Sequence, residues 1–184
     1  MAALHPIFEA TELTAAHRDR CSPACSNTIR TARSRLDEVV KGLAARLEKT
    51  KLGYGLDEGT TMGPLHAKSQ KAFVDMLIKE AKESGAQVME FAELPGGDMA
   101  GGNFVRPAIV VNPNLNLKVV TEEQFGPVIP IIPFDSEADA IRMANDTWGG
   151  LCGSVWTKDP AAANRVGGQL VCGYVWVNDH GATR

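Results

Sequence analysis

The sequence lacks three features that would each point to a class of protein. It has no cluster of basic residues and a net charge of −3, which argues against nucleic acid as its main partner because phosphate binding needs grouped Lys and Arg. No apolar run is long enough to cross a bilayer, and residues 1–20 lack the basic-then-apolar order of a signal peptide. We therefore expect a cytoplasmic protein with neither a nucleic acid nor a membrane as partner.

Cysteine is also scarce, and its four positions are Cys21, Cys25, Cys152 and Cys172. They are too few and too scattered for a disulfide scaffold, which predicts reduced thiols. His17, Cys21 and Cys25 are spaced as on one face of a helix, but Pro23 would break that helix and a zinc site needs a fourth ligand. We predict no metal site and assign Cys152 and Cys172 to packing.

The apolar and charged fractions, 44% and 22%, are those of a folded globular protein. Residues 1–33 show no clean periodicity and are predicted to be irregular. Helices are predicted over 34–50, 66–84, 136–147 and 161–170, and strands over 88–91, 104–111, 128–134, 153–157 and 173–178. Prolines inside the strands 104–111 and 128–134 favour edge or bulged positions. The alternation of strands and helices predicts an α/β fold with a mostly parallel sheet flanked by helices.

One stretch combines charge, an aromatic ring and a turn at the entry to a predicted buried strand: it runs Thr121-Glu122-Glu123-Gln124-Phe125-Gly126-Pro127-Val128. Loops at such places often bind ligands in α/β folds. Glu122 and Glu123 are either solvated loop charges, or one of them accepts hydrogen bonds from both hydroxyls of a ribose while Phe125 covers a flat ring. Spacing alone leaves both interpretations open.

Four landmarks occur in one order along the chain. They are the glycine-rich stretch 55–64, Glu122 to Pro127, the pair Ala144-Asn145-Asp146-Thr147 and Gly150-Leu151, and Val175-Trp176-Val177-Asn178. Together, over about residues 35–180, they resemble the catalytic domain of the NAD(P)-dependent aldehyde dehydrogenases. The resemblance implies the fold of that domain, NAD or NADP as cofactor, an aldehyde as small-molecule substrate and a carboxylic acid as product.

The resemblance also implies roles for individual residues. Glu123 corresponds to the glutamate that holds the nicotinamide ribose, and Phe125 to its aromatic neighbour. Cys25, with Arg30 five residues later, resembles the family's nucleophilic cysteine and its downstream arginine, but the preceding Asn and Gly-Gln of the family are absent. Cys25 is therefore either the catalytic nucleophile or an ordinary exposed thiol, and the link from Arg30 to Asp37 is predicted to be too short for the family's next strand. Asn178 is either a cap or a residue that lines the substrate site.

We expect a divergent N-terminal segment over residues 1–33 and a partial aldehyde-dehydrogenase-like catalytic domain over 34–184. No strand-helix unit with a glycine fingerprint precedes it, so the nucleotide-binding domain is expected to be absent and the chain to be an inactive fragment. The alternative is a non-catalytic interaction module or truncated isoform that forms a homo-oligomer or associates with full-length subunits.

Overall fold

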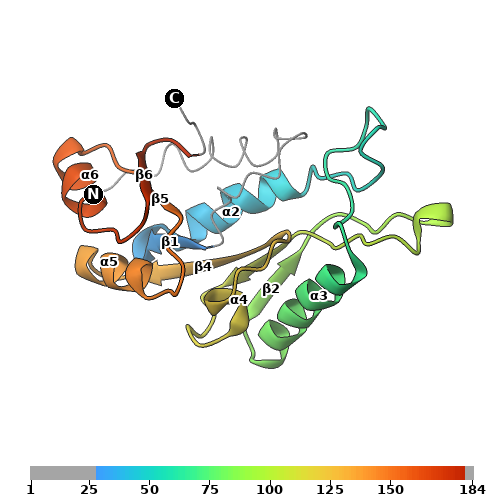
Figure 1. Ribbon diagram of the computed structural model, residues 1–184, viewed down its shortest axis with the longest axis horizontal. Coiled ribbons are helices and arrows are strands. Elements are labelled where there is room, and N and C mark those ends of the chain that lie inside the picture. The colour runs from blue at the N-terminus through green and yellow to red at the C-terminus, as the bar shows by residue number, and fades with distance from the viewer. Residues whose placement is uncertain (1–27, 181–184) are drawn as a thin grey trace. The chain divides into compact units, whose positions relative to one another are not determined.

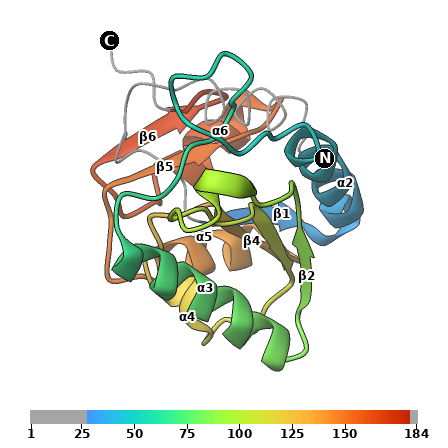
Figure 2. The same ribbon diagram turned by 90° about the vertical axis from the view of Figure 1, so that its right-hand side faces the viewer.

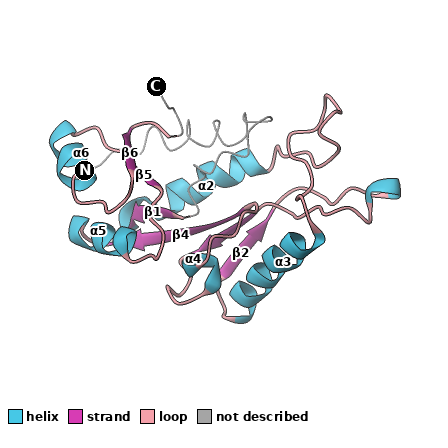
Figure 3. Cartoon of the chain, viewed as in Figure 1, coloured by secondary structure: helices cyan, strands magenta, loops and turns pink. Residues whose placement is uncertain are grey.

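Strands and helices alternate along residues 28–180, which are the residues that the computed structural model describes (Figures 1 and 3). In chain order the elements are β1 (Ile29–Ala32), the 3-10 helix η1 (Arg33–Arg35), α2 (Leu36–Leu47), α3 (Lys68–Glu83), β2 (Gln87–Glu90), the 3-10 helix η2 (Gly97–Met99), β3 (Ala108–Val111), α4 (Lys118–Thr121), β4 (Val128–Phe134), α5 (Glu137–Asn145), β5 (Cys152–Val155), α6 (Pro160–Gly167) and β6 (Tyr174–Val177). None of the helices among these residues is both long and apolar enough to cross a membrane. The α/β class predicted from the sequence is confirmed.

The larger sheet has the strand order β1-β4-β3-β2. β3 and β4 are parallel, whereas β2 and β3 are antiparallel. The prediction that the proline-containing strands lie at an edge or a bulge is wrong, because β3 and β4 are both interior. β3 begins at Ala108, after Pro107, so it contains no proline.

Pro130 lies inside β4 with its nitrogen on the β1 side of the strand, so the donor that proline lacks is missing on that side and not on the β3 side. The N–H groups of Ala108 and Asn112 donate to the carbonyls of Pro127 and Ile131, so the odd-numbered residues of β4 bond to β3. The nitrogen of Pro130, an even-numbered residue, therefore points away from β3. The missing donor leaves the β3–β4 ladder intact.

The N-terminal part of the described chain corrects a second expectation. Residues 1–33 are predicted to be irregular, and the link from Arg30 to Asp37 too short for a strand. Ile29–Ala32 nevertheless form β1, and η1 follows directly. A four-residue strand fits because η1 replaces a loop, so α2 begins at Leu36 rather than at the predicted residue 34. The division of the chain at residue 33 stays a prediction.

The described residues form two compact units. The first, which we call the α3 unit, contains residues 28–29 and 40–132; the second, the β5–β6 unit, contains residues 30–39 and 133–180. In the α3 unit, α3 packs beside α4 and against β2 (Figure 2).

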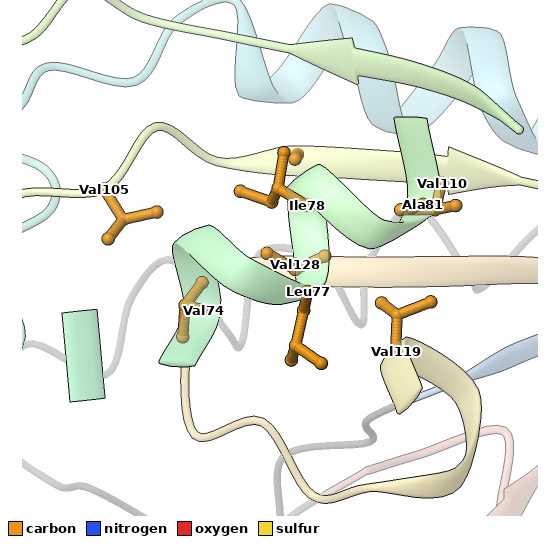
Figure 4. Packing of buried hydrophobic residues seen from close by; sticks show 9 residues of the cluster. Val74, Leu77, Ile78, Ala81, Val105, Val110, Val119 and Val128 are labelled. Carbon is orange, nitrogen blue, oxygen red and sulfur yellow. The ribbon is translucent and has the colours of Figure 1, made fainter. Parts of the chain in front are cut away.

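The hydrophobic core of the α3 unit lies under α3 (Figure 4). Val74, Leu77, Ile78 and Ala81 form one helical face at i, i+3, i+4 and i+7 and are at most 6% exposed. Phe73 and Met76, on the same helix, are only partly buried and pack against this cluster. The β-branched side chains lie deeper because they fill the space above β3 and the start of β4.

The β5–β6 unit contains a parallel pair of strands on which α6 packs. Its helices start as the sequence predicts. The Ser136 hydroxyl accepts from the Asp139 N–H ahead of α5, and the Asp159 carboxylate accepts from the Ala161 N–H ahead of α6, where proline occupies the first helical position.

Candidate functional site

The candidate site is the loop Thr121–Val128, which connects α4 to β4 in the α3 unit. It leaves α4 with a hydrogen bond of 2.8 Å from the Glu122 N–H to the Lys118 carbonyl. It enters β4 through a tight turn at Pro127, where the Val128 N–H donates to the Gly126 carbonyl over 2.9 Å. Both ends of the loop are thus fixed by backbone hydrogen bonds.

The buried Gln124 side chain links the two ends of the loop. Its side chain is 1% exposed, and its Nε2 donates to the Val119 carbonyl over 3.3 Å and to the Val128 carbonyl over 3.2 Å. One amide group therefore joins the last turn of α4 to the first residue of β4. A buried polar side chain with two backbone partners restrains a loop, because both hydrogen bonds form away from water.

Two residues of α3 brace the loop from the other side. Gln70 Nε2 donates to the Gln124 carbonyl over 2.5 Å, and Val74 contacts Gly126. A Cβ placed on Gly126 would lie 2.5 Å from Val74 Cγ2, closer than two carbon atoms can approach. Gln70 and Val74 are four residues apart and so face the loop from consecutive turns of α3.

The alternation within the loop leaves Glu123 and Phe125 pointing outward. Gln124 is buried, Glu123 is half-buried, and Phe125 is 61% exposed. Phe125 adopts a left-handed backbone with φ of 41°, which is unusual for an aromatic residue and is held here by its braced neighbours.

The Glu123 carboxylate has no hydrogen bond or ion pair within residues 28–180. Glu122, next to it, is exposed. A half-buried carboxylate can accept hydrogen bonds from two hydroxyl groups, and the exposed ring of Phe125, two residues away, offers an apolar face. The hypothesis of a ribose ligand with an aromatic neighbour stays a prediction for these two side chains.

Asn178, the predicted substrate-lining residue, follows β6 in the β5–β6 unit. Its Oδ1 accepts from the Thr157 N–H and its Nδ2 donates to the Thr157 carbonyl, each over 2.9 Å. Its backbone N–H donates to the Val155 carbonyl, and its φ is 53°. Its amide therefore holds the ends of β5 and β6 together, which agrees with the alternative that Asn178 is a cap.

Cys25, together with Cys21 and His17, lies outside the described residues. Arg30, the arginine that follows Cys25 in the resemblance, lies in β1 and is half-buried. Burial lowers the pKa of the Arg30 guanidinium, and the charge of Asp146 opposes that shift. Its Nε is buried and makes no hydrogen bond within residues 28–180.

The glycine-rich loop has the geometry of a self-contained turn. The Gly53 N–H donates to the Met62 carbonyl, and Leu52 and Met62 form a parallel bridge. The next helix, α3, begins only at Lys68, after an extended Ala67. The loop therefore does not open a helix, as a phosphate-binding loop would. Over residues 28–180, no group of His, Cys, Asp and Glu is arranged to hold a metal ion.

Sequence reasoning missed the contribution of Gln70. The residue is 54 positions away from Gln124, and one polar residue on a charged helix gives no signal of such a contact. The position of Gln124 inside a motif flanked by charged and aromatic residues was the only available hint of its inward orientation.

A family model, that of the aldehyde dehydrogenase family, matches residues 18–184. The chain therefore belongs to the aldehyde dehydrogenase family, as its ordered motifs predict. It is 37% identical to a betaine aldehyde dehydrogenase of Bacillus subtilis over 78% of this chain and 29% of that protein. It is 38% identical to an Escherichia coli succinate-semialdehyde dehydrogenase [NADP(+)] over 84% of this chain and 31% of that protein.

The fold resembles solved structures of the same family. A betaine aldehyde dehydrogenase from Staphylococcus aureus, in complex with NAD+, matches with a TM-score of 0.86 and 30% identity, over 99% of this chain and 36% of that one. The chain thus spans about a third of the length of the relatives it matches.

Proposed function

We propose that this chain carries the nicotinamide-facing corner of an NAD(P)-dependent aldehyde dehydrogenase, in which Glu123 accepts hydrogen bonds from the ribose hydroxyls. The observation that carries the proposal is the half-buried Glu123 carboxylate, which has no partner within the described chain and lies on a loop braced at both ends. Phe125 supplies an apolar surface beside it. The names of the relatives support NAD or NADP as the dinucleotide.

The proposed reaction oxidises an aldehyde to a carboxylic acid. Glu123 would hold the ribose of a dinucleotide, which would supply the hydride acceptor, and Glu123 would fix the position of the ribose rather than take part in bond making. In the same proposal the thiolate of Cys25 attacks the aldehyde carbon to form a thiohemiacetal, and loss of hydride from that carbon leaves a thioester. Water then hydrolyses the thioester to release the acid and the thiol. Asn178 would contribute the shape of the substrate site, since its amide is engaged by Thr157.

The test compares two adjacent carboxylates in the purified chain. Glu123→Gln removes the charge that should hold the ribose, and we expect the dissociation constant for NAD+ or NADP+ to rise about tenfold or more, as for hydrogen bonds to charged groups. Glu122→Gln makes the same chemical change one residue away, on an exposed side chain, and should leave binding unchanged. Titration of each variant by isothermal calorimetry measures the difference.

Two results would contradict the assignment. If wild type binds neither nucleotide, the chain does not use this loop for a cofactor on its own. If both glutamine variants weaken binding equally, a general negative charge is responsible rather than the Glu123 carboxylate. An assay of NADH or NADPH formation with an aldehyde then tests whether the chain catalyses the reaction.

The surface of the β5–β6 unit favours a second candidate function. In this function the chain associates with a copy of itself or with a full-length relative. Val171, Tyr174 and Val177 are 75%, 49% and 46% exposed, although they lie in or beside a strand. Apolar side chains along a strand often mark a contact surface. Light scattering of the chain, alone and mixed with a full-length relative, tests this. A monomer that does not bind the relative would contradict it.

We further propose a cytoplasmic location, in keeping with the reduced thiols expected from the sequence.

A further inference from the structure

We propose that α3 positions the cofactor-binding side chains through Gln70 and Gln124, so that these two glutamines act as positioning residues for Glu123 and Phe125. The inference rests on the proposed function of the loop and deepens it. It assigns a role to residues that touch neither the ribose nor the nicotinamide in that proposal.

The two glutamine side chains hold different parts of the loop. Gln124 Nε2 holds Val119 and Val128, so its side chain fixes the two ends of the loop but not the peptide that carries Glu123 and Phe125. The Gln124 carbonyl lies between those two residues, and Gln70 Nε2 binds it. Gln70 therefore fixes the orientation of the peptide between Gln124 and Phe125.

The backbone of Phe125 is in the left-handed region. With φ of 41°, this aromatic residue occupies a region that L residues seldom adopt. Such a conformation persists only where the surroundings determine it. The restraints on either side are the Gln70 bond to the preceding carbonyl and the contact of Val74 with the following Gly126, and both originate from α3. Loss of the Gln70 bond would remove one of these two restraints on the Gln124–Phe125 peptide.

The experiment uses Gln70→Met, which keeps the length and neutrality of the side chain but removes the N–H donor. The matched control is Gln169→Met, because Gln169 Nε2 also donates to a backbone carbonyl, that of Arg165, over 2.9 Å. Deuterium uptake of residues 121–128, measured by mass spectrometry, should increase in Gln70→Met and remain at the wild-type level in Gln169→Met. Equal uptake in wild type and Gln70→Met would overturn the proposal.

A binding measurement then separates positioning from mere stability. We expect Gln70→Met to weaken NAD+ or NADP+ binding about fivefold, the effect of one hydrogen bond. In a Glu123→Gln background the same substitution should have little further effect, because the carboxylate that it positions is gone. Additive effects, or faster exchange with unchanged affinity, would overturn the positioning role. If wild type binds no nucleotide, the proposed cofactor site fails, while the exchange measurement still decides whether Gln70 braces the loop.

Discussion

The two units of the molecule differ in their internal packing. In the α3 unit, four residues on one face of α3 are at most 6% exposed and pack in a continuous hydrophobic core. In the β5–β6 unit, Trp176 is the only buried residue of the two strands.

Polar side chains also hold backbone segments of the β5–β6 unit together. Asn145 holds the Gln169 carbonyl and the Val171 N–H, each over 2.8 Å, and Asn178 holds both backbone groups of Thr157. The candidate cofactor loop is thus attached to the unit with the larger apolar core. A rigid core is the better support for a site whose side chains must keep a fixed geometry.

The largest expected effect tests the core of the α3 unit. Leu77→Ala removes a fully buried side chain, and we expect it to lower the free energy of unfolding by about 3–5 kcal/mol. Val177→Ala, at a side chain that is 46% exposed, should cost less than about 1 kcal/mol. Urea unfolding of both variants measures the difference. Similar losses would show that the two units do not differ in packing.

The next effect tests the contact between α3 and the loop. Gly126→Ala places a methyl group against Val74, and overpacking of this kind costs about 1–3 kcal/mol. Gly149→Ala is the control, since the nearest atom to its new methyl group, Thr147 Oγ1, lies 3.9 Å away. Thermal unfolding should show a clear loss for the first variant and little for the second. Combining Gly126→Ala with Val74→Ala should relieve the clash, and an unrelieved loss would contradict the contact.

A smaller effect tests the polar clamp at the end of β6. Asn178→Ala removes two hydrogen bonds to Thr157 and leaves alanine at a φ of 53°, which together should cost about 2 kcal/mol. Asn178→Gly loses the same bonds but tolerates that backbone, so chemical denaturation should find it the more stable of the two variants. Equal stability to wild type in both would show that the clamp does not support the unit.

The smallest expected effect is a pH dependence of the β5–β6 unit. The hydrogen bond from Arg165, with Nε 2.6 Å from Oε1, lowers the pKa of the Glu137 carboxyl. Because the folded state holds this carboxylate ionised, its contribution is present above the ordinary glutamate pKa and is lost as pH falls through the lowered value. Glu137→Gln should therefore lose less stability than wild type when urea unfolding is repeated below about pH 5. Identical pH profiles would contradict this.

Most of the architecture could be predicted because periodicity and capping are local. The end of α3 just before Gly85 follows from short-range chemistry, and so do the starts of α5 after Ser136 and of α6 after Asp159. Strand positions within the sheet could not be predicted, because the prolines favoured an edge position, whereas the structure has β4 between β1 and β3. Strand β1 was missed because a 3-10 helix shortened the connection to α2.

The candidate site was predictable in its chemistry but not in its support. Glu123 and Phe125 stand in a recognisable motif, Glu123 is half-buried and Phe125 is exposed in the structure, and their use as cofactor ligands stays a prediction. The bracing by Gln70 joins residues 54 positions apart, which no local pattern indicates. The sequence singled out Asn178 as a cap or a substrate-lining residue, but only the structure shows that its amide is hydrogen-bonded to the backbone of Thr157.

The most direct test of the account is to map nucleotide binding onto the backbone of the chain by NMR. On addition of NAD+ or NADP+, the account predicts that the largest changes in amide chemical shift fall between Glu122 and Gly126. It also predicts that Glu123→Gln abolishes these changes while Glu122→Gln preserves them. Changes centred on the glycine-rich residues 53–63 instead, or no changes at all, would contradict the central claim that the loop before β4 is the cofactor site.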